Sequence, residues 1–190
     1  MRYPTEHKAE VRQKIVKDAS RRVRAEGLNG AAVASVMRDA GLTHGGFYKH
    51  FENKDELLME SLHLAFSDIG DTLVAAANQS RSEEPWKAIV KTYLRPEYCN
   101  QVERGCPLPA LAPEMARVDK TKRSQVVAEL IIYRDRMLPF MPGRRATDKE
   151  RAFFVIFSTM IGAVDIARLL PSPAQEKVLA IAKDFLLQSF

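Results

Sequence analysis

Cysteine is scarce in this chain of 190 residues, which has only Cys99 and Cys106. Two cysteines do not build a disulfide framework in a chain of this length, so the sequence favours a reducing, cytoplasmic setting. The N-terminus is polar and charged, and it lacks the apolar stretch of a signal peptide. With 46% hydrophobic residues, the chain has enough apolar side chains to fold around a core.

Long apolar runs are also missing. The most apolar stretch covers residues 153–164, and Ser158 and Thr159 interrupt it. It is followed by Asp165 and Arg168, and it is too short to span a bilayer. We therefore expect no membrane partner, and we interpret this stretch as a helix that is buried in the core or in an interface.

The residue patterns that enzymes need are absent as well. We find no Ser/His/Asp set, no paired carboxylates, no glycine-rich phosphate loop and no cluster with metal-ligand spacing. The four histidines, at positions 7, 44, 50 and 63, all lie in the first third of the chain. We therefore expect neither catalysis nor a bound metal or other cofactor.

Positive charge is concentrated near the N-terminus. Residues 1–50 contain ten Lys and Arg against five Asp and Glu, and this excess equals the net charge of +5 of the whole chain. The remaining residues are therefore neutral overall. Such asymmetry suggests a polyanionic partner at that end. A solvated basic helix surface explains the same charges equally well.

The apolar pattern predicts an all-α protein. We find no strand-like alternation of any length, and apolar residues recur at helical spacing between short breakers. In the first segment, Val11, Ile15, Ala19 and Val23 recur every four residues and line one face of a helix. We predict nine helices, which cover about residues 5–26, 32–40, 44–50, 53–80, 85–98, 110–117, 120–138, 147–170 and 172–188.

Short polar signals mark several predicted helix ends. Asn53 with Glu56, and Thr147 with Glu150, fit capping boxes at two helix starts. Gly27 fits a left-handed cap at the end of the first helix. These signals divide the chain into helices joined by short turns.

The segment from Gly27 to Lys54 carries the most specific pattern. It consists of a predicted helix, a glycine turn and a second helix, at the separation that a helix-turn-helix requires. The second helix would begin at Thr43, which suits an N-cap, and Gly45 and Gly46 follow. Two glycines each cost about 1 kcal/mol of helix stability relative to alanine. They suit a helix whose backbone must approach a DNA phosphate or base edge closely.

This segment resembles the DNA-binding domain of the TetR family of bacterial regulators, over about residues 8–65. The matching residues are Ala40, Gly41, Leu42, Thr43, Gly45, Phe47, Tyr48, His50, Phe51, Lys54, Glu56 and Leu57. The resemblance implies a nine-helix TetR-like fold, with a three-helix DNA-binding domain over residues 1–52 and an effector-binding and dimerisation domain over residues 53–190. The helix-turn-helix would cover about residues 32–51.

The resemblance also implies roles for single residues. Phe47 and Phe51 would anchor the reading helix to the core. The residues expected at double-stranded operator DNA, in the groove or on phosphates, are Thr43, His44, Gly45, Gly46, Tyr48, Lys49, His50 and Lys54. For His50, a structural hydrogen bond fits as well as a DNA contact.

Four residues depart from the family pattern. Ala31 and Ala32 stand where a Thr or Ser hydroxyl often caps the second helix and touches phosphate, so Asn29 would cap instead. Met37 stands where the family usually has a small residue, and His44 replaces the commoner Lys or Arg, so the charge there would depend on pH. Base readout would therefore be sparse, with backbone and phosphate contacts carrying much of the affinity.

The central helices contain aromatic residues that fit an effector site. The expected contacts of a largely apolar small-molecule effector are Trp86, Tyr93, Met115, Tyr133 and Phe157. Aromatic side chains at helical spacing are also typical of an ordinary core, so both interpretations stay open.

The last two helices are more apolar than two surface helices need. The resemblance implies that they pair with their copies in a four-helix homodimer interface. The expected interface contacts are Phe154, Phe157, Ile161, Val178 and Phe185. Burial of these side chains within one monomer is the alternative.

Together these features predict a ligand-responsive repressor that binds a palindromic operator as a homodimer. Two alternatives remain. One is a helical small-molecule-binding protein that does not bind DNA. The other is a redox- or electrophile-sensing regulator that uses Cys106, because a nearby helix N-terminus lowers the pKa of a thiol. Burial of Cys106 as a small apolar side chain is the plainer interpretation.

Overall fold

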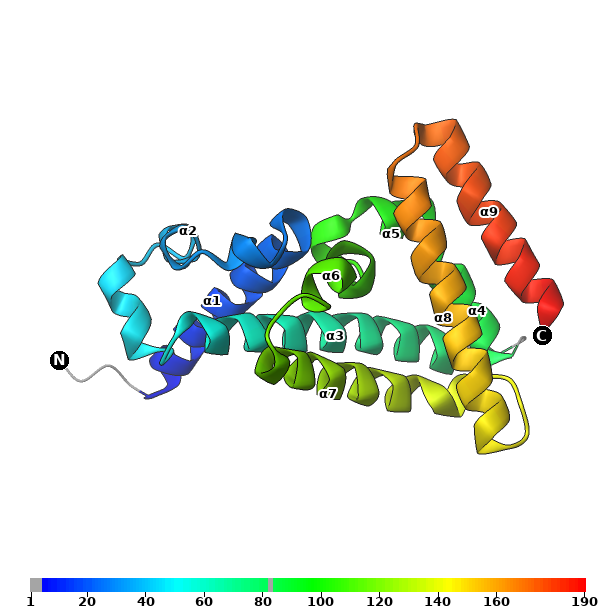
Figure 1. The fold of residues 1–190 in the computed structure, drawn as a ribbon, viewed down its shortest axis with the longest axis horizontal. Coiled ribbons are helices and arrows are strands. Elements are labelled where there is room, and N and C mark those ends of the chain that lie inside the picture. Colours follow the sequence, from blue (N-terminus) through cyan, green and yellow to red (C-terminus); the bar gives the residue numbers. More distant parts are fainter. Residues whose placement is uncertain (1–4, 82–83) are drawn as a thin grey trace.

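The long helix α3 (Lys54–Gln79) runs through most of the molecule and connects its two ends (Figure 1). In this computed structural model, residues 5–81 and 84–190 are described, and they form nine α-helices, four short 3-10 helices and no strand. The other α-helices are α1 (Thr5–Glu26), α2 (Val33–Asp39), α4 (Pro85–Tyr93), α5 (Pro96–Asn100), α6 (Pro107–Met115), α7 (Lys120–Met137), α8 (Ala146–Arg168) and α9 (Ser172–Ser189). The 3-10 helices are η1 (Leu28–Ala31), η2 (His44–Lys49), η3 (Val102–Arg104) and η4 (Leu138–Phe140). The predicted all-α architecture is confirmed.

A small head forms at one end, where α1 packs against the start of α3 and where α2 and η2 lie (Figure 1). Its core is a cluster of buried apolar side chains, separate from the core of the rest of the chain. The cluster consists of Ile15, Val16, Ala19, Val36, Met37, Ala40, Phe47, Phe51 and Leu57. Leu57 comes from α3, so the long helix closes the core of the head before it enters the larger domain.

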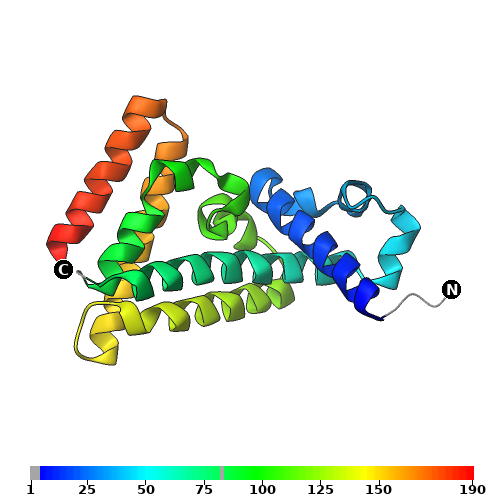
Figure 2. The ribbon, with the colours of Figure 1, turned by 180° about the vertical axis from the view of Figure 1, so that it is seen from behind.

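The larger domain is built around the rest of α3, with α7 packed along it (Figures 1 and 2). At the end far from the head, α8 and α9 lie side by side, and α9 forms the outer edge. Trp86 and Tyr93 on α4, Tyr133 on α7 and Phe157 on α8 share one buried apolar core. No helix in the described part of the chain is long and apolar enough to span a membrane.

Arg24, near the end of α1, joins the head to the larger domain. Its side chain is only 2% exposed. It donates hydrogen bonds to the backbone carbonyls of Ser20 (3.1 Å) and Gly105 (3.2 Å), and the carboxylate of Asp68 on α3 lies 3.5 Å away. Burial lowers the pKa of Arg24, and the nearby charge of Asp68 opposes that shift. A buried charge is tolerated here because it is paired and hydrogen-bonded.

Glu114 on α6 supplies a second link between the two parts. Its Oε2 accepts a hydrogen bond from the backbone amide of Leu28, at 2.9 Å. Gly27 has a φ of 83°, and a Cβ at this position would lie 2.6 Å from Oε1 of Glu114. The positive φ therefore favours glycine, and a side chain at this position would displace the carboxylate of Glu114. The predicted left-handed cap is wrong in one respect, because the ψ of Gly27 is 179°, which is an extended value.

Prolines shift two of the predicted helix boundaries. The predicted helix over residues 85–98 is wrong, because Pro96 begins α5 and has no amide with which to continue α4. The predicted start of the next helix at about residue 110 is also wrong, since α6 begins at Pro107. Proline is well tolerated at the first helical position, where its missing amide would have no helical partner.

The start of α3 confirms Asn53 as the predicted N-cap, but the carboxylate of Glu56 binds a different amide from the one that a capping box requires. Oδ1 of Asn53 accepts a hydrogen bond from the backbone amide of Glu56, at 2.9 Å. The carboxylate of Glu56 accepts a hydrogen bond from the amide of Glu52, at 2.6 Å, and not from Asn53 itself. The cap therefore also holds the residue that precedes it, which fixes how the chain enters α3.

The predicted second capping box, of Thr147 with Glu150, is wrong. The N-cap of α8 is Arg145, and its backbone amide and guanidinium both donate to the carboxylate of Asp148. The helix therefore begins at Ala146, slightly before the predicted start. The prediction searched for a Ser or Thr at the N-cap, so it could not identify an arginine in that position.

The buried hydrogen bonds of Arg24 lead to a stability prediction. Arg24→Met removes the donors for the buried carbonyls of Ser20 and Gly105 and keeps most of the packing volume. We expect the free energy of unfolding to fall by about 1–3 kcal/mol, because the buried carbonyl of Gly105 loses its donor and Asp68 loses its counter-charge. Urea unfolding followed by circular dichroism measures this. Lys17→Met, at an exposed position of the same helix, is the control and should change stability by less than about 0.5 kcal/mol.

Candidate nucleic-acid interface

The segment η2 (His44–Lys49) occupies the place of the predicted reading helix, but it is a 3-10 helix in this structure. Thr43 stands at its N-cap position and makes no capping hydrogen bond with its side chain, so that part of the prediction is wrong. A Cβ added to Gly45 would meet nothing within 4 Å. Packing within the free protein therefore does not demand glycine at this position. The lack of a side chain becomes useful when a partner approaches the backbone.

Two phenylalanines anchor η2 to the core of the head, as predicted. Phe47 and Phe51 are 1% and 2% exposed, and their rings stack with centroids 5.3 Å apart. Between them in sequence, Tyr48 is 69% exposed and touches Phe47 only edge-on. Between the two buried rings, the side chains of Tyr48, Lys49 and His50 therefore lie at or near the surface.

The α2 helix lacks a side-chain cap. Its N-cap is Ala32, which has no capping side chain, and Asn29 lies within η1 instead of replacing the missing hydroxyl. The prediction that Asn29 caps α2 is therefore wrong. Met37 is fully buried in the head core. A Cβ added to Gly46 would lie 3.6 Å from the terminal methyl of Met37, which is ordinary van der Waals contact. The large side chain at this position is thus accommodated under the turn.

His50 is half-buried, and its surroundings are basic. Burial lowers the pKa of His50, and the charges of Lys8, Arg12 and Lys49 lower it further. The imidazole is therefore neutral at pH 7 and adds no positive charge to this surface. Its backbone carbonyl accepts a hydrogen bond from Nε of Arg12, at 3.1 Å, which ties the end of η2 to α1.

A hollow of about 510 Å³ lies between the start of α1 and the turn before η2. Its lining residues are His7, Lys8, Val11, Gly41, Leu42, Thr43, Gly46, Lys49 and His50. The structure thus brings Lys8, from α1, beside residues of the predicted DNA-reading segment. Sequence reasoning missed Lys8 because the family motif lies about forty residues further along the chain. The only available signal was its position in the basic N-terminal quarter.

Lys54 is set apart from this group. It lines a different hollow together with Leu28 and Glu114, at the junction of the head and α6. The other residues predicted at DNA are either exposed on η2 or line the first hollow. The predicted DNA contacts therefore fall into a main group around η2 and a separate lysine at the start of α3.

Part of the positive charge of the head serves folding. The guanidinium of Arg12 contacts the carboxylates of Glu56 and Glu60 on α3 and lies over the ring of Phe51. Arg22 pairs with Glu26 and Asp39. Together with buried Arg24, these residues hold the helices of the head in place. A DNA backbone would meet the other basic residues, chiefly the exposed lysines of α1 and η2.

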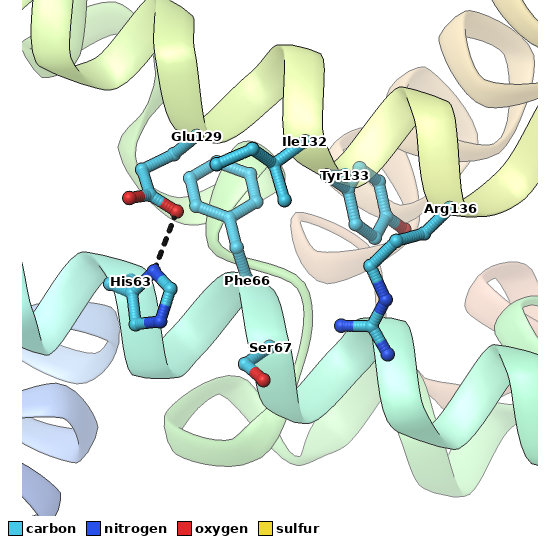
Figure 3. Close-up of a pocket in the computed structure, with 7 residues that line it drawn as sticks. All are labelled: His63, Phe66, Ser67, Glu129, Ile132, Tyr133 and Arg136. Carbon is cyan, nitrogen blue, oxygen red and sulfur yellow. Dashed lines mark hydrogen bonds and ion pairs between the residues drawn. The ribbon is translucent and has the colours of Figure 1, made fainter.

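The predicted effector contacts all lie in the core of the larger domain. Trp86, Tyr93, Met115, Tyr133 and Phe157 are at most 3% exposed. Tyr133 also lines a small pocket of about 30 Å³ between α3 and α7, with Phe66 beside it (Figure 3). This volume holds about one water molecule. Contact of these side chains with an effector stays a prediction.

The predicted dimer contacts divide between surface and core. Phe154 on α8 is 50% exposed and Phe185 on α9 is 59% exposed, whereas Ile161 and Val178 are half-buried. Phe157 is buried among core aromatics within one chain, so it does not lie on this exposed face. The predicted contacts did not include the other exposed large apolar residues of α8 and α9, namely Val155, Ile166 and Ile181.

Cys106 stands at the N-cap of α6 and is fully buried. Burial raises the pKa of its thiol to about 11, although Tyr93 and two arginines act in the opposite direction. The predicted lowering by the helix N-terminus is therefore wrong. The thiol is protonated at pH 7, which removes the physical basis of the sensor alternative and favours the apolar interpretation.

The head matches known proteins in sequence. Residues 15–60 match the family described as bacterial regulatory proteins, tetR family. Over 62 residues the chain is 34% identical to the HTH-type transcriptional regulator AcrR of Shigella flexneri, a match that spans 33% of this chain and 29% of that regulator. The match covers the head alone, so the head, over residues 15–60, carries the DNA-binding sequence of the TetR family. The relative that matches it is a transcriptional regulator.

Solved structures resemble the whole chain in fold. A TetR transcriptional regulator from Chloroflexus aurantiacus J-10-FL has a TM-score of 0.76 and 23% identity, over 97% of this chain and 98% of that chain. A TetR-family regulator from Cytophaga hutchinsonii has a TM-score of 0.76 and 18% identity, over 95% of each chain. The predicted TetR-like fold is thus confirmed. At these identities the likeness concerns the fold alone.

The position of Lys8 beside Lys49 predicts how this TetR-family head binds DNA. We expect Lys49→Ala and Lys8→Ala each to weaken binding to every DNA sequence and to reduce the slope of log K against log salt by about 1. Fluorescence anisotropy at several salt concentrations measures both quantities. Arg144→Ala, in an exposed turn of the other domain, serves as control. An unchanged slope for Lys8→Ala would place that lysine outside the interface.

Proposed function

We propose that this protein is a homodimeric TetR-family repressor that binds a palindromic operator and responds to a small-molecule effector. The observation that carries the proposal is the presence, in one chain, of a basic reading head and an exposed apolar face on the last two helices. A palindromic operator needs two heads related by a two-fold axis. The apolar face offers the self-complementary surface that such a pair requires.

The last two helices expose several large apolar side chains, which we call the apolar face. Its exposed members on α8 and α9 are Phe154 (50%), Val155 (41%), Ile166 (55%), Ile181 (59%) and Phe185 (59%). These two helices lie side by side at the end far from the head, so two copies would meet as a four-helix bundle (Figure 2). Five large apolar side chains exposed on two adjacent helices favour an interface.

The response to an effector is supported by the contacts of α6. This helix inserts Leu111 and Met115 into the apolar core, where they are 0% and 3% exposed. From the same helix, Glu114 reaches the amide of Leu28 at the end of the head. A ligand that shifts α6 would therefore move the head as well. The ligand acts only if it binds the two resulting states with different affinity.

Selection of bound DNA tests the operator proposal. The pure protein is mixed with sheared genomic DNA, and the retained fragments are sequenced at moderate salt. We expect enrichment of one sequence with two inverted half-sites about one helical turn or two apart. Retention of fragments with no shared sequence would contradict a specific operator. If no DNA is retained even at low salt, the result would favour a helical ligand-binding protein that does not bind DNA.

The exposed face of α9 yields a dimer prediction. Phe185→Glu places a charge in the proposed interface, so we expect the protein to become monomeric in light scattering. Operator affinity should fall by about 100-fold, because the two heads no longer bind as one unit. Ile131→Glu changes an equally apolar residue on α7, 43% exposed, and should leave the mass unchanged. A dimeric Phe185→Glu protein would place the interface elsewhere.

The contact between Glu114 and Leu28 predicts how the head is held. Glu114→Ala leaves the amide of Leu28 without its carboxylate partner. We expect hydrogen exchange at Leu28 to accelerate by about tenfold or more, because a charged hydrogen bond is lost. NMR-detected exchange measures this, with the amide of Val16 in the middle of α1 as internal reference. Equal acceleration at both amides would indicate general loosening instead of a local link.

A further inference from the structure

Three tyrosine hydroxyls are buried in the core of the larger domain. They belong to Tyr93 on α4, Tyr98 on α5 and Tyr133 on α7, and none makes a hydrogen bond of normal geometry to the part of the chain that the structure describes. Cys106 lies nearest to two of them: its thiol, a weak acceptor, faces Tyr93, and its backbone faces Tyr98. Tyr93 and Tyr133 are at most 1% exposed. Buried hydroxyls are normally satisfied, because leaving one without a partner costs stability. Three such groups in one domain therefore point to a missing partner.

The three phenols surround a common centre. The rings of Tyr93 and Tyr98 have centroids 5.6 Å apart. Phe157 lies edge-on against both Tyr93 (6.3 Å) and Tyr133 (5.6 Å), so it links the two from α8. Burial raises the pKa of Tyr93 and of Tyr133, and the thiol of Cys106 adds to the rise in both. The hydroxyls thus stay protonated and keep their capacity to donate hydrogen bonds.

A small pocket between α3 and α7 reaches one of the three phenols, Tyr133. Figure 3 shows the pocket of about 30 Å³ there, with the rings of Phe66 and Tyr133 between two polar ends. At one end His63 contacts Glu129 at 2.9 Å (Figure 3), and at the other Arg136 pairs with Asp71. Exposed ion pairs of this kind contribute little to stability. The line of contact between α3 and α7, here called the seam, is therefore closed at both ends by polar contacts that cost little free energy to break.

We propose that the effector is a neutral compound with a carbonyl oxygen on a flat apolar frame, which enters between α3 and α7 and accepts hydrogen bonds from Tyr93 and Tyr133. This inference rests on the proposed response to a small molecule and names the chemical class of that molecule. The seam must widen to admit it, because pockets for ligands of ordinary size hold about 300 Å³ or more.

The surroundings of the phenols select this class. A carbonyl oxygen accepts two hydrogen bonds and donates none, which matches a site that offers mainly donors. The frame is apolar and flat because phenylalanine rings, Phe66 and Phe157 among them, line the centre. The ligand is neutral because the nearest guanidiniums are already engaged: Arg24 lies beside Asp68, and Arg168 donates to the carbonyl of Cys99 at 3.0 Å.

Removal of the hydroxyls tests whether they lack a partner. Tyr93→Phe and Tyr133→Phe each delete one buried polar atom and keep the ring. We expect each variant, free of ligand, to melt about 2–4 °C higher than the parent protein. Tyr48→Phe, which deletes an exposed hydroxyl, should melt at the parent temperature. A lower melting temperature for Tyr93→Phe and Tyr133→Phe would mean that the hydroxyls have structural partners and would overturn the proposal.

Acetophenone, which carries a carbonyl on a phenyl ring, is the probe for the ligand class. At millimolar concentration we expect it to raise the melting temperature of the parent protein more than ethylbenzene, which has the same carbon skeleton without the oxygen, and more than charged benzoate. In Tyr93→Phe and Tyr133→Phe the excess over ethylbenzene should shrink. An equal effect of acetophenone and ethylbenzene, or an excess that survives in both variants, would refute the class.

Operator binding separates this inference from the proposed function. If acetophenone binds as expected but operator affinity stays the same, the ligand class stands and the ligand response fails. If ethylbenzene or benzoate releases DNA and acetophenone does not, the response stands and the proposed class fails. The two measurements use the same full-length protein, so the comparison needs no isolated domain.

Discussion

The burial of Arg24 is the constraint on which the arrangement of the molecule depends. A guanidinium in an apolar setting must keep its charge balanced and its donors satisfied. Arg24 meets both needs only when α1, the segment around Gly105 and the face of α3 with Asp68 are in one relative position. The orientation of the DNA-binding head is thereby coupled to the loop that begins α6.

The head itself separates two uses of positive charge. Arg12 and Arg22 are held by carboxylates within the chain, where they contribute to the packing of α1 against α2 and α3. Lys8 and Lys49 line the hollow beside η2 instead of joining the helices of the head. Net charge alone therefore overstates the charge that DNA would meet. Phosphate contacts would depend on fewer cations, which agrees with a reading segment poor in long basic side chains.

Much of the fold could be predicted from the sequence, because strong apolar periodicity and glycine turns specify long helices locally. The start of α3 at Asn53 followed from its capping pattern. The 3-10 geometry of η2 and the helical start at Pro107 could not be predicted, since both depend on tertiary contacts and on prolines that allow helix starts as well as breaks. Local sequence carries no unique signal for either.

The candidate site was predictable only where a motif covers it. Phe47 and Phe51 were identified as anchors, but Lys8 joins the same surface through tertiary packing that no local pattern encodes. In α8, apolar residues occupy nearly every face, so periodicity could not separate exposed Phe154 from buried Phe157. The unpartnered tyrosine hydroxyls could not be predicted either, because the sequence around a core tyrosine does not show whether its hydroxyl has a hydrogen-bond partner.

The continuity of α3 has a mechanical consequence. Its 26 residues belong to both cores, with Leu57 in the head and Leu73 among the apolar residues of the larger domain. At 1.5 Å per residue this helix is about 39 Å long, so a tilt of about 5° at one end displaces the other by about 3 Å. The helix acts as a lever arm. A rearrangement too small to disturb the apolar core can therefore shift a DNA-reading segment by nearly the distance between successive base pairs.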